Sequence, residues 1–187
     1  MVGNYMIDPA HASLLVVDIQ EKLLPVIHNG AAVVERAVKM VNIARVLDVP
    51  ILVTEQYVTG LGPTVQPLRD ALAAADAYRP IEKLRFSALA DAPFKRAFDA
   101  LKRRDLLVVG IETHICVLQT CLDAISCGYS VHVIDDATGS RNPEEKARGL
   151  QRLTLIGAIV SSVEMASYEL IREARTPGFA AARPYLL

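Results

Sequence analysis

Cysteine is scarce in this sequence, which has only three, and no two of them form a Cys-X-X-Cys pair. The odd number and the missing pairs argue against a disulfide framework. The first residues show no basic start followed by an apolar stretch, so we expect no secretory leader. Together these absences predict free thiols in a reduced, cytoplasmic setting.

An excess of charge of either sign is also missing, because 20 Lys and Arg balance 21 Asp and Glu. Without a basic field or an acidic tail, we expect no nucleic-acid partner. No apolar run approaches the ~20 residues that cross a bilayer, so we expect no membrane partner either. These absences leave a small molecule, or a second copy of the chain, as the expected partner.

Motifs that hold phosphates or metals are missing as well. The first apolar run is followed by DIQEKLLP at residues 18–25, where a dinucleotide site needs Gly-X-Gly-X-X-Gly. No Gly-X-X-X-X-Gly-Lys-Ser/Thr loop is present. None of the histidines pair at metal-ligand spacing, and they are His11, His28, His114 and His132. We therefore expect no cofactor and no catalytic metal.

What the chain does have is a regular alternation of short apolar runs and longer amphipathic segments. Its 187 residues, 52% of them hydrophobic, suffice for a single domain that spans residues 1–187. Runs such as VVD, LVT, VVG and VID are typical of strands buried on both faces. They predict an α/β three-layer sandwich around a six-stranded parallel sheet, Rossmann-like in outline. Strands are expected at residues 13–18, 50–55, 79–82, 106–110, 130–135 and 158–162. Helices are expected at residues 31–47, 65–75, 93–102, 114–127, 143–156 and 164–173.

Polar side chains gather where the predicted strands end. In an open parallel sheet, ligands bind beyond the carboxyl ends of the strands. We therefore expect the site to be drawn from the residues at those ends. They are Asp18, Gln20, Glu55, Gln56, Lys83, Cys116, Asp135 and Asp136.

Cys116 lies at the start of the predicted helix 114–127, just past the strand at 106–110. Unpaired N–H groups and the helix dipole favour a thiolate at such a position, which predicts a nucleophile. The alternative is a small buried hydrophobe, the commoner fate of a free cysteine. Cys121 and Cys127, further along the helix, are expected to be structural. A redox sensor would need a resolving cysteine, and Cys121 does not face Cys116 on a helix.

Asp18 and Lys83 each have an ordinary explanation when taken alone. Asp18 ends an apolar strand, a place where carboxylates often cap the following turn, and most lysines are solvated. Taken together, a carboxylate, an amine and a thiol at three strand ends of one sheet form a nucleophile with a base and a cationic partner. This combination predicts a catalytic triad of Asp18, Lys83 and Cys116.

Four blocks of sequence carry a family resemblance. They are VVDIQEKLLP at residues 16–25, TEQYVTGLGPTV at 54–65, EKLRFSA at 82–88 and GIETHICVLQT at 110–120. With these blocks in this order, the chain resembles the isochorismatase-like cysteine hydrolase superfamily over almost its whole length. Within that superfamily it looks closest to the small isochorismatase domain-containing branch.

The resemblance implies a hydrolase and a role for each triad residue. Asp18 would be the general base, Lys83 its cationic partner and Cys116 the nucleophile. The resemblance also implies a cis peptide between Ile111 and Glu112, and an oxyanion hole formed by the N–H groups of Glu112 and Cys116. Such a site attacks an electrophilic carbon and forms an acyl enzyme, which water then releases.

Departures from the family pattern limit the substrate. Nicotinamidases of this superfamily carry an Asp-X-His metal motif after the second strand, where this chain has TEQY. A cysteine nucleophile favours hydrolysis of a C–N bond in a small amide or ureide. The alternatives are the vinyl ether cleavage of true isochorismatases, some of which lack the cysteine, and a catalytically silent scaffold of the same fold. Residues expected to contact substrate are Gln20, Glu55, Gln56, Tyr57 and His114.

Two interpretations remain open for each of three further features. His114 either touches substrate or only hydrogen-bonds the backbone. The segment at residues 57–65 is either a lid or subunit contact, or an ordinary surface loop. The stretch at residues 176–187, apolar and without helical caps, either packs back on the body or reaches a neighbour. Family members commonly assemble as dimers, tetramers or larger rings, so the resemblance implies a homo-oligomer.

Overall fold

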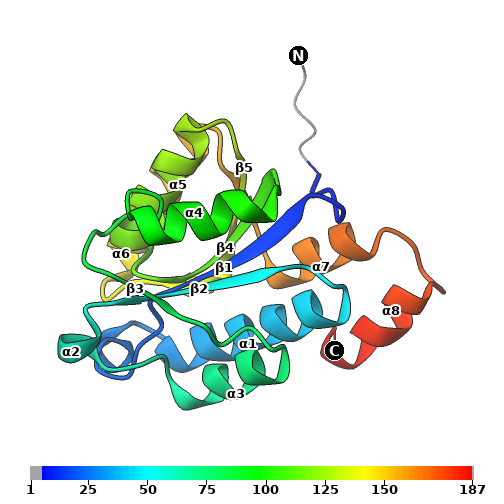
Figure 1. Cartoon of the computed structure of the whole chain (residues 1–187), viewed down its shortest axis with the longest axis horizontal. Helices are drawn as coiled ribbons and strands as arrows, with labels where there is room; N and C mark the ends of the chain where they lie inside the picture. Colours follow the sequence, from blue (N-terminus) through cyan, green and yellow to red (C-terminus); the bar gives the residue numbers. More distant parts are fainter. Residues whose placement is uncertain (1–5, 187) are drawn as a thin grey trace.

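The computed structural model describes residues 6–186, and its centre is a six-stranded parallel sheet (Figure 1). The strands lie in the order β3-β2-β1-β4-β5-β6. They are β1 (Ala12–Val17), β2 (Ile51–Gln56), β3 (Ile81–Lys83), β4 (Asp105–Ile111), β5 (Ser130–Gly139) and β6 (Ile159–Ser161). All six predicted strands are present, and all but β5 begin and end within two residues of the expected bounds. The predicted α/β fold is confirmed.

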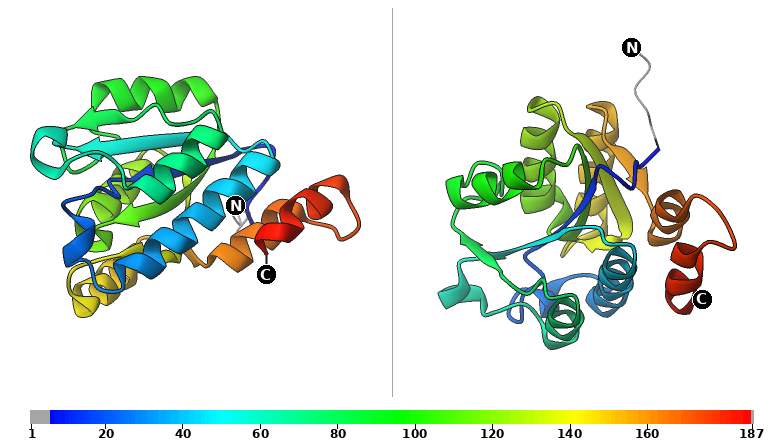
Figure 2. Two further views of the ribbon diagram at one scale, coloured as in Figure 1. Left: turned by 90° about the horizontal axis from the view of Figure 1, so that it is seen from below. Right: turned by 45° about the vertical axis from the view of Figure 1, so that its right-hand side comes forward.

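Helices cover both faces of the sheet and complete the three layers (Figures 1 and 2). One face carries α1 (Gly30–Val46), α3 (Gln66–Ala74), α7 (Val163–Ile171) and α8 (Pro177–Ala182). The other carries α4 (Ala92–Leu101), α5 (Leu118–Ser126) and α6 (Pro143–Leu155). A four-residue helix, α2 (Val58–Leu61), lies in the loop after β2. Within residues 6–186, no helix combines the length and apolar character that crossing a bilayer requires.

Buried side chains alternate between the two faces along the central strand β1. Leu14 and Val16 pack in the core under α1, whereas Leu15 and Val17 pack in the core under α4 and α5. All four are fully buried, and burial of each stabilises the fold by about 1.5–3 kcal/mol. Burial on both faces explains the continuous apolar runs, and it makes the sheet a firm support for the polar residues at its carboxyl edge.

Strand β5 runs to Gly139, four residues beyond its expected end. Its pairing with β4 shifts register between Val108 and Gly110, and beyond this irregularity the two strands pair again through Gly139. The apolar pattern stops at the irregularity, which is why it indicated an earlier end.

Asp135 and Asp136 therefore lie inside β5, which corrects their placement at the strand end. The Lys146 ammonium lies 2.8 Å from Asp135 Oδ1. Asp136 Oδ1 accepts a hydrogen bond of 2.8 Å from the N–H of Val163, the first residue of α7. Both carboxylates are engaged in joining the sheet to helices.

The C-terminal stretch is capped, contrary to expectation. The Thr176 hydroxyl accepts a hydrogen bond of 3.1 Å from the N–H of Phe179 and so caps α8. The stretch packs back on α1, where Arg45 donates a hydrogen bond of 2.8 Å to the Tyr185 hydroxyl. Its last residue, Leu187, lies outside the described residues.

Candidate active site

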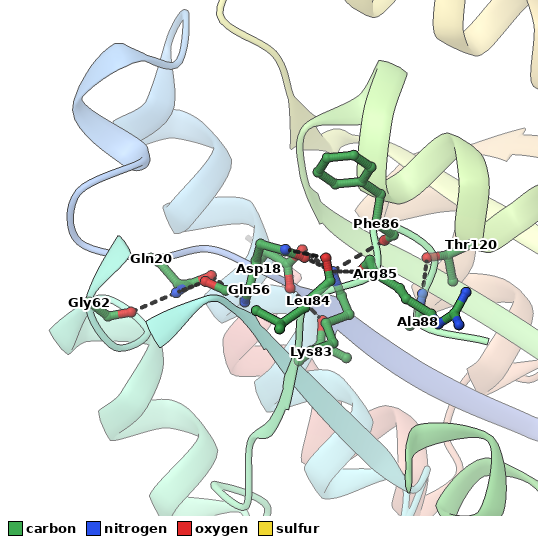
Figure 3. A network of polar contacts seen from close by, with 11 residues as sticks. Asp18, Gln20, Gln56, Gly62, Lys83, Leu84, Arg85, Phe86, Ala88 and Thr120 are labelled. Atoms are coloured by element: carbon green, nitrogen blue, oxygen red, sulfur yellow. Dashed lines mark hydrogen bonds and ion pairs between the residues drawn. The ribbon is translucent and has the colours of Figure 1, made fainter. Parts of the chain in front are cut away.

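Asp18 and Lys83 form a buried ion pair at the carboxyl edge of the sheet (Figure 3). Asp18 directly follows β1, and Lys83 is the last residue of β3. Lys83 Nζ lies 2.6 Å from Asp18 Oδ2, and both side chains are 0% exposed. The interpretation of Lys83 as an ordinary solvated lysine is therefore wrong.

The backbone at Asp18 directs its carboxylate toward the end of β2. Asp18 has a left-handed conformation (φ 52°), and its N–H donates a hydrogen bond of 3.1 Å to the Thr54 carbonyl. The Thr54 hydroxyl in turn donates one of 2.7 Å to Asp18 Oδ1. The short 3-10 helix that follows, Leu24–Val26, has no side-chain cap. Asp18 is thus engaged by Thr54 and Lys83, and the interpretation of it as a cap is wrong.

The Lys83 ammonium is surrounded by acceptors. Besides Asp18, it donates to Gln56 Oε1 at 2.8 Å and contacts the carbonyls of Arg85 and Phe86 at 3.3 and 3.2 Å (Figure 3). An ammonium has three N–H donors, so these acceptors saturate it. They hold the amine between β2 and the loop after β3.

Cys116 lies in a π-helical turn, Thr113–Val117, that joins β4 to α5. The carbonyl of Glu112 accepts a hydrogen bond of 3.2 Å from the N–H of Val117 across this turn. The residue is 6% exposed, and its thiol lies close enough to the Asp18 carboxylate for the negative charge to act on it. Single π-helical turns are often found at functional sites. The thiol is thus carried by this turn, and not by the first turn of a continuous helix as expected.

The position of Cys116 at a helix start was expected to favour a thiolate, and its surroundings in the fold act in the opposite direction. Burial, followed by the negative charge of Asp18, raises the pKa of the Cys116 thiol to about 12, and the Lys83 ammonium opposes the rise. The thiol is therefore protonated at neutral pH. Desolvation outweighs the helix-terminal N–H groups because the sulfur is enclosed by protein.

The other two cysteines have different surroundings. Cys121 is fully buried in the core under α4 to α6, and burial alone raises the pKa of its thiol. Cys127 is exposed at the end of α5. Cys116 also packs in that core, as the alternative interpretation expected, but unlike Cys121 its thiol feels the charges of Asp18 and Lys83.

Successive side chains of β2 point to opposite faces of the sheet, so neighbouring residues of this strand have different surroundings. Thr54 and Gln56 contact the ion pair, whereas Glu55 points to the opposite face. Glu55 Oε1 accepts hydrogen bonds from the N–H and hydroxyl of Thr64, both 2.7 Å, and from the Tyr78 hydroxyl at 3.0 Å. Glu55 thus anchors the loop after β2. Thr54 was missed among the site residues, although the period of two along the strand places it on the face of Gln56.

Gln20 holds the same loop. Its Nε2 donates to the carbonyls of Gln56 and Gly62 at 2.9 and 2.6 Å, and its Oε1 accepts from the Gln56 N–H at 2.7 Å. Tyr57 is 52% exposed and lines a surface hollow of about 570 Å³ with Glu82 and Leu84. Substrate contact by Gln20 and Tyr57 stays a prediction.

Three successive side chains of the segment at residues 112–117 bind residues 139–141, at and just past the end of β5. His114 Nδ1 lies 3.0 Å from the Ser140 hydroxyl, so its partner is a side chain and not the backbone. The peptide bond between Ile111 and Glu112 is cis. The three pairs are Glu112 with Arg141, Thr113 with Gly139, and His114 with Ser140. Arg141 was not predicted as a site residue, because it lies two residues past the end of β5, and β5 was expected to end at residue 135.

We expect chelation to leave turnover unchanged. In the part of the chain that the structure describes, no three His, Cys, Asp or Glu side chains are grouped to hold a metal. Glu55, which stands where nicotinamidases have a ligand, is bound to Thr64 and Tyr78. Turnover before and after dialysis against a chelator, with elemental analysis of the protein, checks this. Activity lost on chelation and restored by one metal would contradict it.

Comparison with known proteins gives close sequence relatives. The isochorismatase domain matches residues 12–165. Isochorismatase domain-containing protein 2A of Mus musculus is 39% identical over 171 residues, which cover 91% of this chain and 80% of that protein. The secreted isochorismatase effector Isc1 of Phytophthora sojae is 36% identical over 172 residues, which cover 91% and 82%.

Solved structures share the fold at similar coverage. The MAR1 ribonuclease from Caenorhabditis elegans has a TM-score of 0.89 at 32% identity, covering 97% of this chain and 92% of that one. YcaC from Pseudomonas aeruginosa, solved with hexane-2,5-diol and covalent acrylamide, has a TM-score of 0.90 at 26% identity, covering 100% and 94%. The domain match and these identities together show that the chain belongs to the isochorismatase family.

Proposed function

We propose that this member of the family is a cysteine hydrolase that cleaves a C–N bond of a small amide or ureide with Cys116, Asp18 and Lys83. The position of one carboxylate carries the proposal. Asp18 lies close enough to the Cys116 thiol for its charge to raise the pKa of that thiol, and it lies 2.6 Å from the Lys83 ammonium. A base that contacts the nucleophile and is oriented by a third group is the arrangement of an activated nucleophile.

The first half-reaction moves one proton and exchanges one bond. Asp18 takes the proton of the Cys116 thiol as the sulfur attacks the substrate carbonyl carbon, and the carbonyl electron pair moves onto oxygen. Protonated Asp18 then gives the proton to the leaving nitrogen as the C–N bond breaks, which leaves a thioester on Cys116. Proton transfer during the attack avoids a free thiolate, which a pKa of about 12 makes unfavourable.

The second half-reaction restores the enzyme. Asp18 accepts a proton from water as the water oxygen attacks the thioester carbon. The C–S bond breaks, the sulfur regains the proton from Asp18, and a carboxylic acid or its carbamic analogue leaves. Throughout, Lys83 compensates the charge of Asp18, and we assign the N–H groups of Glu112 and Cys116 to the oxyanion, as the family resemblance implies. One such donor contributes about 3 kcal/mol to transition-state stabilisation.

The names of relatives suggest other substrates, which the site supports less well. The Caenorhabditis elegans relative is named a ribonuclease. A polyanion binds through an excess of cationic side chains, whereas this chain has a net charge of −1. A second alternative is the vinyl ether cleavage that true isochorismatases carry out. A silent scaffold has no need of a carboxylate, an amine and a thiol grouped at one edge of the sheet.

A hydrolysis screen tests the proposal. The purified chain is incubated with small amides, ureides, isochorismate and a single-stranded RNA, and the products are identified by mass spectrometry. Release of ammonia or an amine from an amide or ureide supports it. Cleavage of isochorismate or RNA alone would replace the substrate class, and no reaction with any substrate would favour the scaffold.

Asp18→Asn should lower turnover at least about a hundredfold, because it removes the base while keeping the shape of the side chain. The matched control is Asp70→Asn, which makes the same change at an exposed position of α3. Turnover and circular dichroism are measured on both variants. A folded Asp18→Asn protein with wild-type turnover would remove Asp18 from the mechanism.

We also propose that the chain forms a homo-oligomer in the cytoplasm. YcaC from Escherichia coli is described as an octameric hydrolase of unknown specificity. Leu84 is 72% exposed here, and Phe86 beside it is also exposed. Exposed apolar side chains grouped in this way often mark interaction surfaces. All three cysteines are free, which supports a cytoplasmic location. Light scattering measures the number of subunits in the assembly.

A further inference from the structure

Thr54 is bound to the proposed general base through both its backbone and its side chain. It lies on β2 and is 0% exposed. Its carbonyl accepts a hydrogen bond of 3.1 Å from the N–H of Asp18, and its hydroxyl donates one of 2.7 Å to Asp18 Oδ1. The mechanism proposed above gives this threonine no part, although the Asp18 carboxylate cannot rotate without breaking the contact.

The two oxygens of the Asp18 carboxylate have different donors. Lys83 Nζ lies 2.6 Å from Oδ2, and the Thr54 hydroxyl lies 2.7 Å from Oδ1. The last side-chain torsion of an aspartate is broad, so a contact to one oxygen alone leaves the carboxylate free to rotate. A donor at each oxygen fixes the plane of the group, and each oxygen keeps a lone pair for a further donor such as a thiol. Lys83 therefore compensates the charge of Asp18, whereas Thr54 sets its orientation.

The strand itself does not need a hydroxyl at this position. In register across the sheet, Thr54 stands between Val17 of β1 and Ile81 of β3, both apolar and β-branched. Valine has nearly the shape of threonine and suits a buried strand. A buried hydroxyl is unfavourable unless it is hydrogen-bonded. Within residues 6–186, the acceptor of the Thr54 hydroxyl is Asp18 alone. The hydroxyl therefore serves the carboxylate and not the packing of the sheet.

We propose that Thr54 is a positioning residue whose hydroxyl holds the Asp18 carboxylate in the orientation that accepts the proton of the Cys116 thiol. The inference rests on the proposed function and deepens it. The proton passes from the sulfur to Asp18 and then to the leaving nitrogen, while the Thr54 hydroxyl keeps its own proton and donates to Oδ1 throughout. Thr54 acts on the reaction through Asp18 alone, because its buried side chain is closed to substrate.

The first test measures hydrolysis of the amide or ureide that the hydrolysis screen identifies. Thr54→Val keeps the shape of the side chain and removes the hydroxyl, so kcat should fall at least about tenfold, because a misplaced catalytic group is costly. KM should change less than about twofold, because the hydroxyl does not bind substrate. Thr54→Ser restores the donor and should keep kcat within about threefold of wild type. Wild-type kcat in Thr54→Val would overturn the proposal.

Thr64→Val is the matched control. Thr64 is also 0% exposed, and its hydroxyl donates a hydrogen bond of the same 2.7 Å to another buried carboxylate, that of Glu55. Both variants should lose a similar amount of stability in urea unfolding, because each leaves a buried carboxylate short of one donor. Thr64→Val should nevertheless keep kcat within about twofold of wild type. An equal loss of kcat in the two variants would assign the effect to a loosened fold and overturn the proposal.

A second measurement does not need turnover. Alkylation of Cys116 by iodoacetamide at neutral pH is followed by peptide mass spectrometry, with the exposed Cys127 of the same protein as the internal reference. The negative charge of Asp18 raises the pKa of the Cys116 thiol. A carboxylate that has lost its donor presents more of that charge, so Thr54→Val should slow Cys116 at least about threefold. Thr54→Ser and Thr64→Val should keep the wild-type rate.

The two measurements separate this inference from the proposed function. A wild-type protein that hydrolyses no amide or ureide would contradict the proposed function, and the alkylation rates would still decide whether Thr54 acts on Asp18. Should Thr54→Val not fold, Thr54→Ala is compared with Thr64→Ala in the same two measurements. Equal Cys116 rates in wild type and in the folded Thr54 variant that lacks the hydroxyl would overturn the proposal.

Discussion

Cys116→Ala should abolish amide or ureide hydrolysis while the protein stays folded. The substitution removes the only atom that can form the thioester, so we expect turnover to fall at least about a thousandfold. The cost in stability should be about 1 kcal/mol, below the about 2–5 kcal/mol of larger core truncations, because only one sulfur atom is lost. Initial rates and urea unfolding of the variant measure the two effects.

Cys127→Ala is the matched control for this experiment. It makes the same chemical change at the exposed end of α5, away from the ion pair, and should retain wild-type rates. If Cys116→Ala turned over substrate as fast as this control, direct attack by water would replace the covalent mechanism. Asp18 would then remain as its base.

Lys83→Met should have the largest effect on stability. Methionine keeps most of the side-chain length but leaves the Asp18 carboxylate buried without its cation, which we expect to cost about 3–5 kcal/mol of unfolding free energy. Turnover should be lost as well. The Lys83 ammonium lowers the pKa of the Cys116 thiol, so its removal raises that pKa further and slows alkylation at every pH below it.

The control for Lys83 is Lys95→Met on α4. Lys95 pairs with Asp99 one helical turn away on the surface, at 2.6 Å, so its loss should cost less than about 1 kcal/mol. The double variant Asp18→Asn with Lys83→Met removes both buried charges and should recover part of the lost stability without recovering activity. Wild-type unfolding free energy and an unchanged alkylation profile in Lys83→Met would mean that the ion pair contributes neither to the fold nor to the thiol.

Local sequence patterns were sufficient to predict the strands and the edge of the sheet at which the site lies. The apolar runs that become β1 and β4 are buried on both faces, so their sequence alone distinguishes them from amphipathic segments. Parallel strands bring their carboxyl ends to one edge, which is why Asp18 and Lys83 were predicted together although 65 positions separate them. The end of β5 was not predicted, because pairing with β4 resumes past a shift in register that only the neighbouring strand reveals.

The sequence by itself determined the α/β fold, the order of its elements and the residue types available at the carboxyl edge, because burial periodicity and strand ends are local properties of the chain. Only the tertiary structure decided the state of those residues. Whether the Cys116 thiol is charged depends on how fully the folded chain excludes water and on the distance to Asp18 and Lys83, and here desolvation outweighs the turn in which the thiol lies. The pairing of Glu112 with Arg141 likewise depends on two segments that meet only after β4 and β5 have aligned.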